Sequence, residues 1–163
     1  MEYTEQSIIQ ALNYRYRRNL VKYKIANSFI FNGGWESDFF IIQRASNYCY
    51  EIEVKITRAD FLKDFEKTKK HLILSGKKNH DLIPNKFFYC VPEGLISKDE
   101  IPPYAGLMYV NYSGVFTVRE APFIHKKILN LDSCLLSKFY NKYMDYKYLI
   151  QQLRDRINFL ESA

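Results

Sequence analysis

The sequence predicts an α/β fold in which helices accompany a β-sheet and the chain ends in one long helix. Three patterns indicate it: an amphipathic stretch over residues 4–18, an alternating strand over residues 50–56, and a heptad pattern after residue 132. A chain of 163 residues has room for one domain with a substantial core. We expect residues 1–130 to form that core and residues 131–163 to form the C-terminal helix of the same domain.

The first element is an amphipathic helix over residues 4–18. Its apolar stripe, at helical spacing, consists of Ile8, Ile9, Leu12 and Tyr16. Glu5 lies on this stripe one turn earlier, where a carboxylate interacts favourably with the dipole at the helix N-terminus. A strand is expected next within residues 23–31, before a turn at Gly33-Gly34.

The most informative segment is residues 50–56, Tyr-Glu-Ile-Glu-Val-Lys-Ile, which alternates apolar and charged side chains with the period of a strand. The apolar side chains face a core, while Glu51, Glu53 and Lys55 share the other face. Two carboxylates at this spacing repel each other, so the arrangement makes most sense if a cation joins them. The alternative is a charged edge strand exposed to solvent.

A second strand is expected upstream, where Asp38 opens the apolar run of residues 39–42. If the turn between the strands lies at residues 44–47, parity places Asp38 opposite Glu53, and every core-facing pair is apolar. Opposed residues have β-carbons roughly 5 Å apart, which lets two carboxylates bind one divalent ion. A slip of one residue would place Asp38 opposite Val54 and destroy the apolar face.

A helix follows the charged strand, because Thr57 can cap it with Asp60 at the third position. Its expected apolar side consists of Phe61, Leu62, Phe65 and Leu72, and Gly76 is a plausible stop. Further strands are expected at residues 86–91, 107–111 and 115–119.

Asp38 on one strand is followed by Glu53-Val54-Lys55, an E-x-K motif, on the next. This pattern resembles the active-site motif of the PD-(D/E)XK nuclease superfamily. Residues 53–64, 86–96 and 105–110 resemble segments of the MmcB-like family of predicted DNA repair endonucleases, so the resemblance covers roughly residues 38–110. Ser37 stands where the superfamily name has proline, which leaves Glu36 as a fallback for the acidic position. The resemblance implies a restriction-endonuclease-like core, a mixed β-sheet flanked by helices.

The same resemblance implies an endonuclease that hydrolyses phosphodiester bonds with Mg²⁺ or Mn²⁺. Asp38, Glu53 and the backbone carbonyl of Val54 would hold the ion, and Lys55 would orient the attacking water or stabilise charge in the transition state. In related nucleases an acidic residue of the first helix often supports the metal, which gives Glu5 a second interpretation beside the dipole. Glu51 could reach a second ion.

The net charge of +6 and the pI near 9.1 favour a polyanionic partner without choosing among DNA, RNA and an acidic membrane. The candidate nucleic-acid contacts are Thr57, Arg58, Lys63, Lys67 and Lys70, of which the lysines would share one helical stripe or simply form a solvated face. DNA, in repair or recombination, is the expected substrate. The alternatives are an RNA-directed nuclease and a non-cleaving nucleic-acid-binding module on the same fold.

After Asp132 the apolar residues alternate between spacings of three and four, with no glycine or proline. This heptad stripe consists of Leu136, Phe139, Tyr143, Tyr146, Ile150, Leu153, Ile157 and Leu160. We expect one helix of about 30 residues, roughly 45 Å long. Its stripe either packs along the core or forms a homodimer.

We expect no membrane span, because no run approaches the roughly 20 apolar residues that a span needs. We expect no secretory leader either, because the first residues are followed by an amphipathic pattern. The three cysteines, Cys49, Cys90 and Cys134, lack metal-ligand spacing and are expected to be reduced thiols. We therefore expect a cytoplasmic protein that does not contact the membrane.

Overall fold

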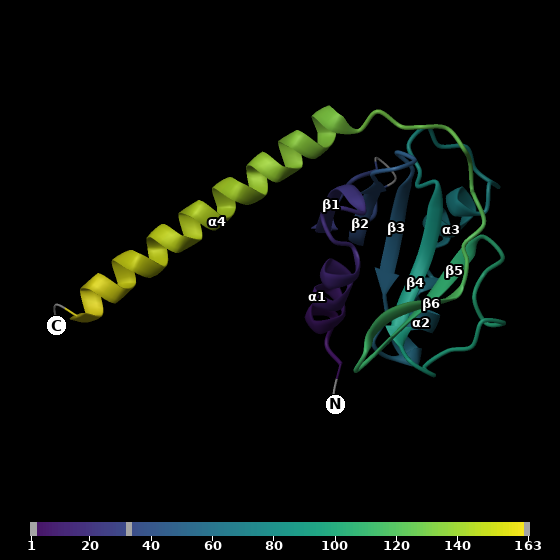
Figure 1. Cartoon of the computed structure of the whole chain (residues 1–163), viewed down its shortest axis with the longest axis horizontal. Helices are drawn as coiled ribbons and strands as arrows, with labels where there is room; N and C mark the ends of the chain where they lie inside the picture. Colours follow the sequence, from purple (N-terminus) through teal and green to yellow (C-terminus); the bar gives the residue numbers. More distant parts are fainter. Residues whose placement is uncertain (1–2, 32–33, 162–163) are drawn as a thin grey trace. The chain divides into compact units, whose positions relative to one another are not determined.

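The computed structural model describes residues 3–31 and 34–161, so Gly33 of the expected turn lies outside the described residues. The chain separates into two compact units, residues 1–129 and 130–163. The first unit contains helix α1 (Glu5–Arg15), a mixed sheet, and helices α2 (Arg58–Asp64) and α3 (Thr68–Leu74) (Figure 1). The second contains helix α4 (Asp132–Glu161).

The sheet of the first unit has six strands within the described residues, and their spatial order follows the sequence. They are β1 (Val21–Ser28), β2 (Ser37–Gln43), β3 (Cys49–Val54), β4 (Lys86–Pro92), β5 (Ala105–Asn111) and β6 (Gly114–Arg119). The pairs β1–β2, β2–β3 and β5–β6 are antiparallel, whereas β3–β4 and β4–β5 are parallel. A mixed sheet flanked by helices is therefore confirmed.

Helix α1 covers one face of this sheet. Thr4 caps it through a capping box with Ser7, and its buried side packs into a core on that face. Core residues from both elements are Ile8, Ile9, Leu12, Phe39, Ile41, Ile52 and Val54. The helix ends at Arg15, earlier than predicted, because the backbone leaves helical geometry at Tyr16 before β1 begins.

Helices α2 and α3 connect β3 to β4 and lie over the opposite face. Thr57 caps α2 by accepting a hydrogen bond from the Asp60 amide, as predicted. The apolar core on this face includes Phe61, Leu74, Phe87, Tyr89 and Val91. Both faces of β3 are thus covered and all of its residues are buried, which excludes the exposed edge strand considered from the sequence.

The single helix expected after Thr57 is wrong, because the chain leaves helical geometry between α2 and α3. Lys67 caps α3 with a non-helical backbone, at φ −73° and ψ 58°. After this break Ile73 and Leu74 are buried. Leu62 and Leu72, assigned to the apolar side of one continuous helix, are instead 55% and 37% exposed. The predicted stop is present, since Gly76 follows α3 at φ +73°.

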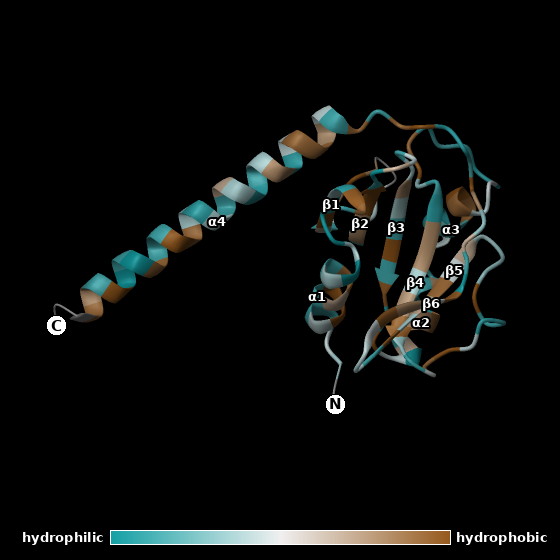
Figure 2. Cartoon of the chain, in the orientation of Figure 1, coloured by the Kyte–Doolittle hydropathy of each residue, from teal (hydrophilic) through white to brown (hydrophobic). Residues whose placement is uncertain are grey.

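The second unit consists of α4, whose 30 residues match the predicted helix. Polar and apolar residues alternate along it, as Figure 2 shows, whereas the strands of the first unit are richer in apolar residues. Over residues 3–31 and 34–161, no helix combines the length and the apolar composition needed to cross a bilayer.

Candidate functional site

The β2–β3 hairpin has the register that the alternation predicts. Phe39 pairs with Ile52 and Phe40 with Glu51, and the same register continued by one residue places Asp38 opposite Glu53. The amide of Val54 donates a hydrogen bond of 2.8 Å to Asp38 Oδ2, which fixes that carboxylate beside the end of β3.

Glu53 is the centre of a buried set of ion pairs, here called the carboxylate–lysine cluster. Its Oε1 lies 2.9 Å from Lys55 Nζ and 3.2 Å from Lys67 Nζ, and its Oε2 lies 2.5 Å from Lys70 Nζ. Glu53 is 1% exposed and Lys70 is 2% exposed. Because a buried charge is stable only when it is paired, these lysines and Glu53 depend on one another.

Asp64 and Glu51 complete the cluster. Asp64 Oδ2 accepts a hydrogen bond of 2.7 Å from the Tyr89 hydroxyl, and its Oδ1 lies 2.9 Å from Lys67 Nζ. Glu51 is fully buried, and its Oε1 accepts a hydrogen bond of 2.8 Å from the indole of Trp35. The cluster therefore comprises Asp38, Glu51, Glu53, Lys55, Asp64, Lys67 and Lys70.

Two of these carboxylates have raised pKa values, so their charged forms are disfavoured. Burial, and then the charge of Glu53, raise the pKa of Asp38 to about 7. Burial also raises the pKa of Glu51 to about 7, although the charge of Lys70 opposes this. Burial alone would lower the pKa of Lys55, but the charge and hydrogen bond of Glu53 outweigh it and raise that pKa. Lys55 is therefore a stable cation at neutral pH.

The carboxylates of the cluster are Asp38, Glu51, Glu53 and Asp64, and its ammonium groups are Lys55, Lys67 and Lys70; Asp60 Oδ1 also lies 3.7 Å from Lys55 Nζ. The charge of Glu53 contributes to the raised pKa of Asp38, and a cation beside these two carboxylates would relieve their repulsion.

Across the described part of the chain, no group of three or more His, Cys, Asp or Glu residues is arranged to hold an ion. Magnesium is commonly held by one or two carboxylates together with waters and substrate phosphates. Asp38 and Glu53 are the two carboxylates that the sequence assigned to such an ion, and both oxygens of Glu53 lie within 3.2 Å of lysine ammonium groups.

The other residues predicted for the metal site occupy three different places. Glu5 is exposed in the first turn of α1, and α1 covers the sheet face opposite Glu53, so Glu5 is not part of the cluster. Glu51, considered for a second ion, is part of the cluster: its Oε1 contacts Trp35 and lies 3.9 Å from Lys70 Nζ, and its buried Oε2 has no hydrogen-bond partner among the described residues. Glu36, the fallback for the acidic position, is exposed.

The expected lysine stripe is not present, because α2 and α3 are separate helices. Lys63 is exposed, the Lys67 side chain is 51% exposed and turned toward Glu53, and Lys70 is buried. Thr57 uses its hydroxyl to cap α2, and the guanidinium of Arg58 pairs with Glu100. Of the predicted nucleic-acid contacts, Lys63, Lys67 and Arg58 are exposed cations, and Lys70 is buried.

Sequence reasoning missed Asp64 and Trp35 and misjudged the direction of Lys70. Asp64 lies three residues after the buried Phe61, and Lys70 lies three residues before the buried Ile73. Helical spacing thus contained a signal that both charged side chains point inward. Trp35 precedes β2 in an irregular segment, where no periodicity indicates its direction.

Two hollows reach the cluster, and Lys67 lines both of them. The first, here the site hollow, has a volume of about 700 Å³ and includes Asp38, Lys67 and Thr68 in its lining. The second, here the lysine hollow, has a volume of about 340 Å³ and includes Lys55, Lys63 and Lys67. Asp38 thus lines one hollow and Lys55 the other.

Comparisons with known proteins support the fold and leave the activity open. No family model matches the chain, and no curated protein matches its sequence. A solved structure, the SPO1766 protein of unknown function from Silicibacter pomeroyi, is similar, with a TM-score of 0.62 and 18% sequence identity. The similarity covers 95% of this chain and 94% of that one, and at this identity it concerns the fold alone.

Proposed function

We propose that this protein is a Mg²⁺- or Mn²⁺-dependent endonuclease that hydrolyses phosphodiester bonds in DNA. The observation that carries the proposal is the arrangement of three residues on one sheet face: Asp38 opposite Glu53, and Lys55 with its Nζ 2.9 Å from Glu53 Oε1. This arrangement supports the resemblance to PD-(D/E)XK nucleases that the sequence suggested. The basic net charge of +6 suits a polyanionic substrate.

In this proposal Asp38, Glu53 and the Val54 carbonyl hold the ion. When bound, the metal supplies a more acidic water and neutralises charge on the scissile phosphate. Lys55 contributes as a cation that stabilises developing negative charge, because its raised pKa keeps it protonated and argues against a role as a general base. Lys67, half exposed between the two hollows, is placed to contact a backbone phosphate.

A non-cleaving nucleic-acid-binding module is the second candidate, and one observation favours it. Both oxygens of Glu53 already lie within 3.2 Å of lysine ammonium groups, Lys55 and Lys67 at one and Lys70 at the other. A carboxylate compensated in this way needs no metal for its own stability. Asp38, which has a raised pKa and no comparable lysine pairing described, favours the nuclease.

Incubation of the purified protein with end-labelled nucleic acids tests the proposal. The panel contains single-stranded, duplex, flap and junction DNA and the matching RNAs, each with Mg²⁺, Mn²⁺, Ca²⁺ or chelator. We expect DNA cleavage with Mg²⁺ or Mn²⁺ and none with chelator. Calcium should support binding with little hydrolysis, because it is larger and less demanding in geometry. Binding without cleavage under every metal would favour the non-cleaving module.

A further inference from the structure

A third hollow, here the aromatic pocket, lies beside the α2–α3 junction and is separate from the site hollow and the lysine hollow. Its volume is about 510 Å³, within the range of roughly 300–1,000 Å³ typical of small-molecule sites. The residues that line it are Phe65, Thr68, His71, Leu72, Ser75, Lys77, Pro102, Pro103 and Tyr104. Its walls are therefore largely aromatic, aliphatic or proline, with a few polar groups at definite places.

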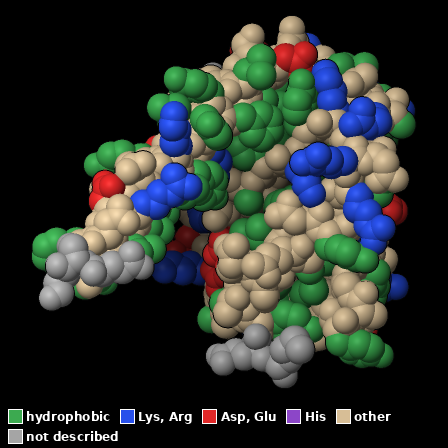
Figure 3. Space-filling view, turned by 60° about the vertical axis from the view of Figure 1, so that its left-hand side comes forward, with side chains coloured by type: hydrophobic (Ala, Val, Ile, Leu, Met, Phe, Trp, Pro, Cys, Tyr) green, Lys and Arg blue, Asp and Glu red, His purple; other side chains and the backbone are tan. Residues whose placement is uncertain are grey.

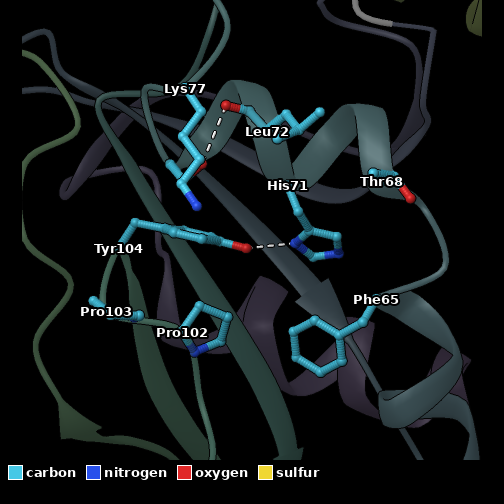
Figure 4. Close-up of a pocket in the computed structure, with 9 residues that line it drawn as sticks. Phe65, Thr68, His71, Leu72, Lys77, Pro102, Pro103 and Tyr104 are labelled. Atoms are coloured by element: carbon cyan, nitrogen blue, oxygen red, sulfur yellow. Dashed lines mark hydrogen bonds between the residues drawn. The ribbon is translucent and has the colours of Figure 1, made fainter.

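Figure 4 shows how these side chains surround the pocket. Phe65, His71 and Tyr104 contribute rings to its walls, Pro102 closes one side, and Lys77 supplies a basic side chain to the lining. Such a pocket offers flat apolar surfaces and one cation. This combination suits a planar aromatic ring that carries a phosphate nearby.

The pocket walls are held in place before any ligand arrives. His71 Nε2 lies 2.9 Å from the Asp64 carbonyl oxygen, so this nitrogen carries the proton, and Nδ1 accepts from the Tyr104 hydroxyl. The rings of Phe65 and His71 are 5.1 Å apart, and Phe65 also contacts Phe61 at 5.2 Å. A ligand would therefore lose little free energy in ordering these side chains.

The aromatic pocket adjoins the proposed active site along one surface. Thr68 lines both the aromatic pocket and the site hollow, and the site hollow also contains Asp38. A strand whose phosphate lies at the cluster could thus place a neighbouring base in the aromatic pocket. In a duplex that base would be stacked and paired, so it would not be free to enter.

We propose that the aromatic pocket binds an unpaired nucleobase, and that this protein therefore recognises single-stranded or flapped nucleic acid in preference to continuous duplex. The base stacks against Tyr104 and Phe65, and Lys77 contacts an adjacent phosphate. This inference rests on the proposed function, because it takes the ligand to be a nucleic acid. It adds the substrate class, which the cluster itself leaves open.

The test is a binding experiment in Ca²⁺, by fluorescence anisotropy, with the full-length protein and a set of single-stranded DNA and RNA oligonucleotides. An abasic analogue is moved along each oligonucleotide one position at a time. We expect one position at which loss of the base weakens binding by about 5- to 150-fold, the range for one stacked base. We also expect 2-aminopurine fluorescence to be quenched most strongly at that position.

Variants then identify the pocket. Tyr104→Ala should weaken binding to the intact oligonucleotide and have little further effect on the oligonucleotide that lacks the critical base. Tyr104→Phe keeps the ring and should bind nearly as wild type does. Tyr112→Ala, at a tyrosine that is 94% exposed on the β5–β6 turn, is the matched control and should change nothing.

A flat abasic scan on wild-type protein would overturn the pocket proposal, even if metal-dependent cleavage is observed. An equal loss for Tyr104→Ala on intact and abasic oligonucleotides would also overturn it. An abasic-sensitive position without cleavage in any metal would support the pocket and overturn the nuclease. The two proposals can therefore fail separately.

Discussion

Asp64 links the lysines of the cluster to His71 in the wall of the aromatic pocket. Burial alone would raise its pKa, but the hydrogen bond with His71, the charges of Lys70 and Lys67, and the Tyr89 hydroxyl hold that pKa well below its usual range. A carboxylate with a depressed folded-state pKa stabilises the fold above its unfolded pKa, near 4. That stabilisation is lost as the pH falls through the folded-state value.

Asp64→Asn should therefore lower the free energy of unfolding at pH 7 by about 2 kcal/mol, since hydrogen bonds to a charged group are worth roughly 1.5–3 kcal/mol. The difference from wild type should shrink as the pH falls from 5 to 3, because the Asp64 carboxylate of the unfolded wild-type chain then becomes protonated while that of the folded protein stays ionised. Urea denaturation at several pH values measures this. Asp60→Asn, at a side chain that is 46% exposed, is the control. A difference that stays constant with pH would contradict the electrostatic role of Asp64.

At the scale of elements, the β2–β3 hairpin could be predicted and the α2–α3 break could not. The strand alternation permits one register in which Phe39 and Ile52 share the core face, and that register also places Asp38 opposite Glu53. The break depends on a contact distant in sequence, since Lys67 at the break reaches back to Glu53 on β3. Helical periodicity carries no information about such a contact.

The same limit explains the partial prediction of the site. Asp38, Glu53 and Lys55 could be placed near one another from the sequence, because Asp38 and Glu53 lie on adjacent strands and Lys55 follows Glu53 at the strand period of two. Lys70 was placed on a solvated stripe, because a charged residue on a helix is usually exposed and no local signal named its buried partner. Its partners become apparent only when α3 is packed over β3.

Helix α4 is the element whose partner the sequence leaves open. Within residues 130–161, α4 is the only helix or strand of its unit. A stripe of this kind is stabilised when a second copy or the core covers it. We retain the prediction of a homodimer, with packing on the core as the alternative.

If α4 forms the dimer, wild-type protein should sediment at twice the monomer mass, and Ile150→Asp should yield a folded monomer because a charge enters the apolar seam. Asn141→Asp introduces the same charge change outside the stripe and should remain dimeric. Sedimentation velocity, with circular dichroism to verify folding, measures both. A monomeric wild-type protein at high concentration would refute the dimer.

For the whole molecule, the excess of basic residues predicts binding that depends on salt. Lys and Arg side chains are spread over the face in Figure 3, where few acidic side chains appear. Each phosphate neutralised by a lysine releases counterions and steepens the salt dependence. Lys63 is exposed in the lysine hollow, whereas Arg58 already pairs with Glu100.

Lys63→Gln should therefore reduce the slope of log Kd against log salt by about 0.7–0.9, the value for one lost phosphate contact. Arg58→Gln should change the slope little, because its guanidinium is already engaged. Anisotropy titrations in Ca²⁺ between 50 and 200 mM salt, roughly the range over which such effects are large, distinguish the two. Equal slopes for Lys63→Gln and wild type would remove Lys63 from the interface.

The Asp38–Glu53 metal site is tested most directly by single-turnover DNA cleavage with Asp38→Asn. This substitution is preferable to Glu53→Gln, which would leave the buried Lys70 poorly paired at a cost of about 3–5 kcal/mol. Asp38→Asn relieves repulsion, so its melting temperature should match or exceed that of wild type.

With Mg²⁺ or Mn²⁺, we expect the cleavage rate of Asp38→Asn to fall by at least about 100-fold, the scale on which loss of one electrostatic contact in an active site lowers the rate. Glu36→Gln, at an exposed carboxylate in the lining of the same hollow, should cleave as wild type does. A folded Asp38→Asn protein that cleaves DNA at the wild-type rate would contradict the metal site.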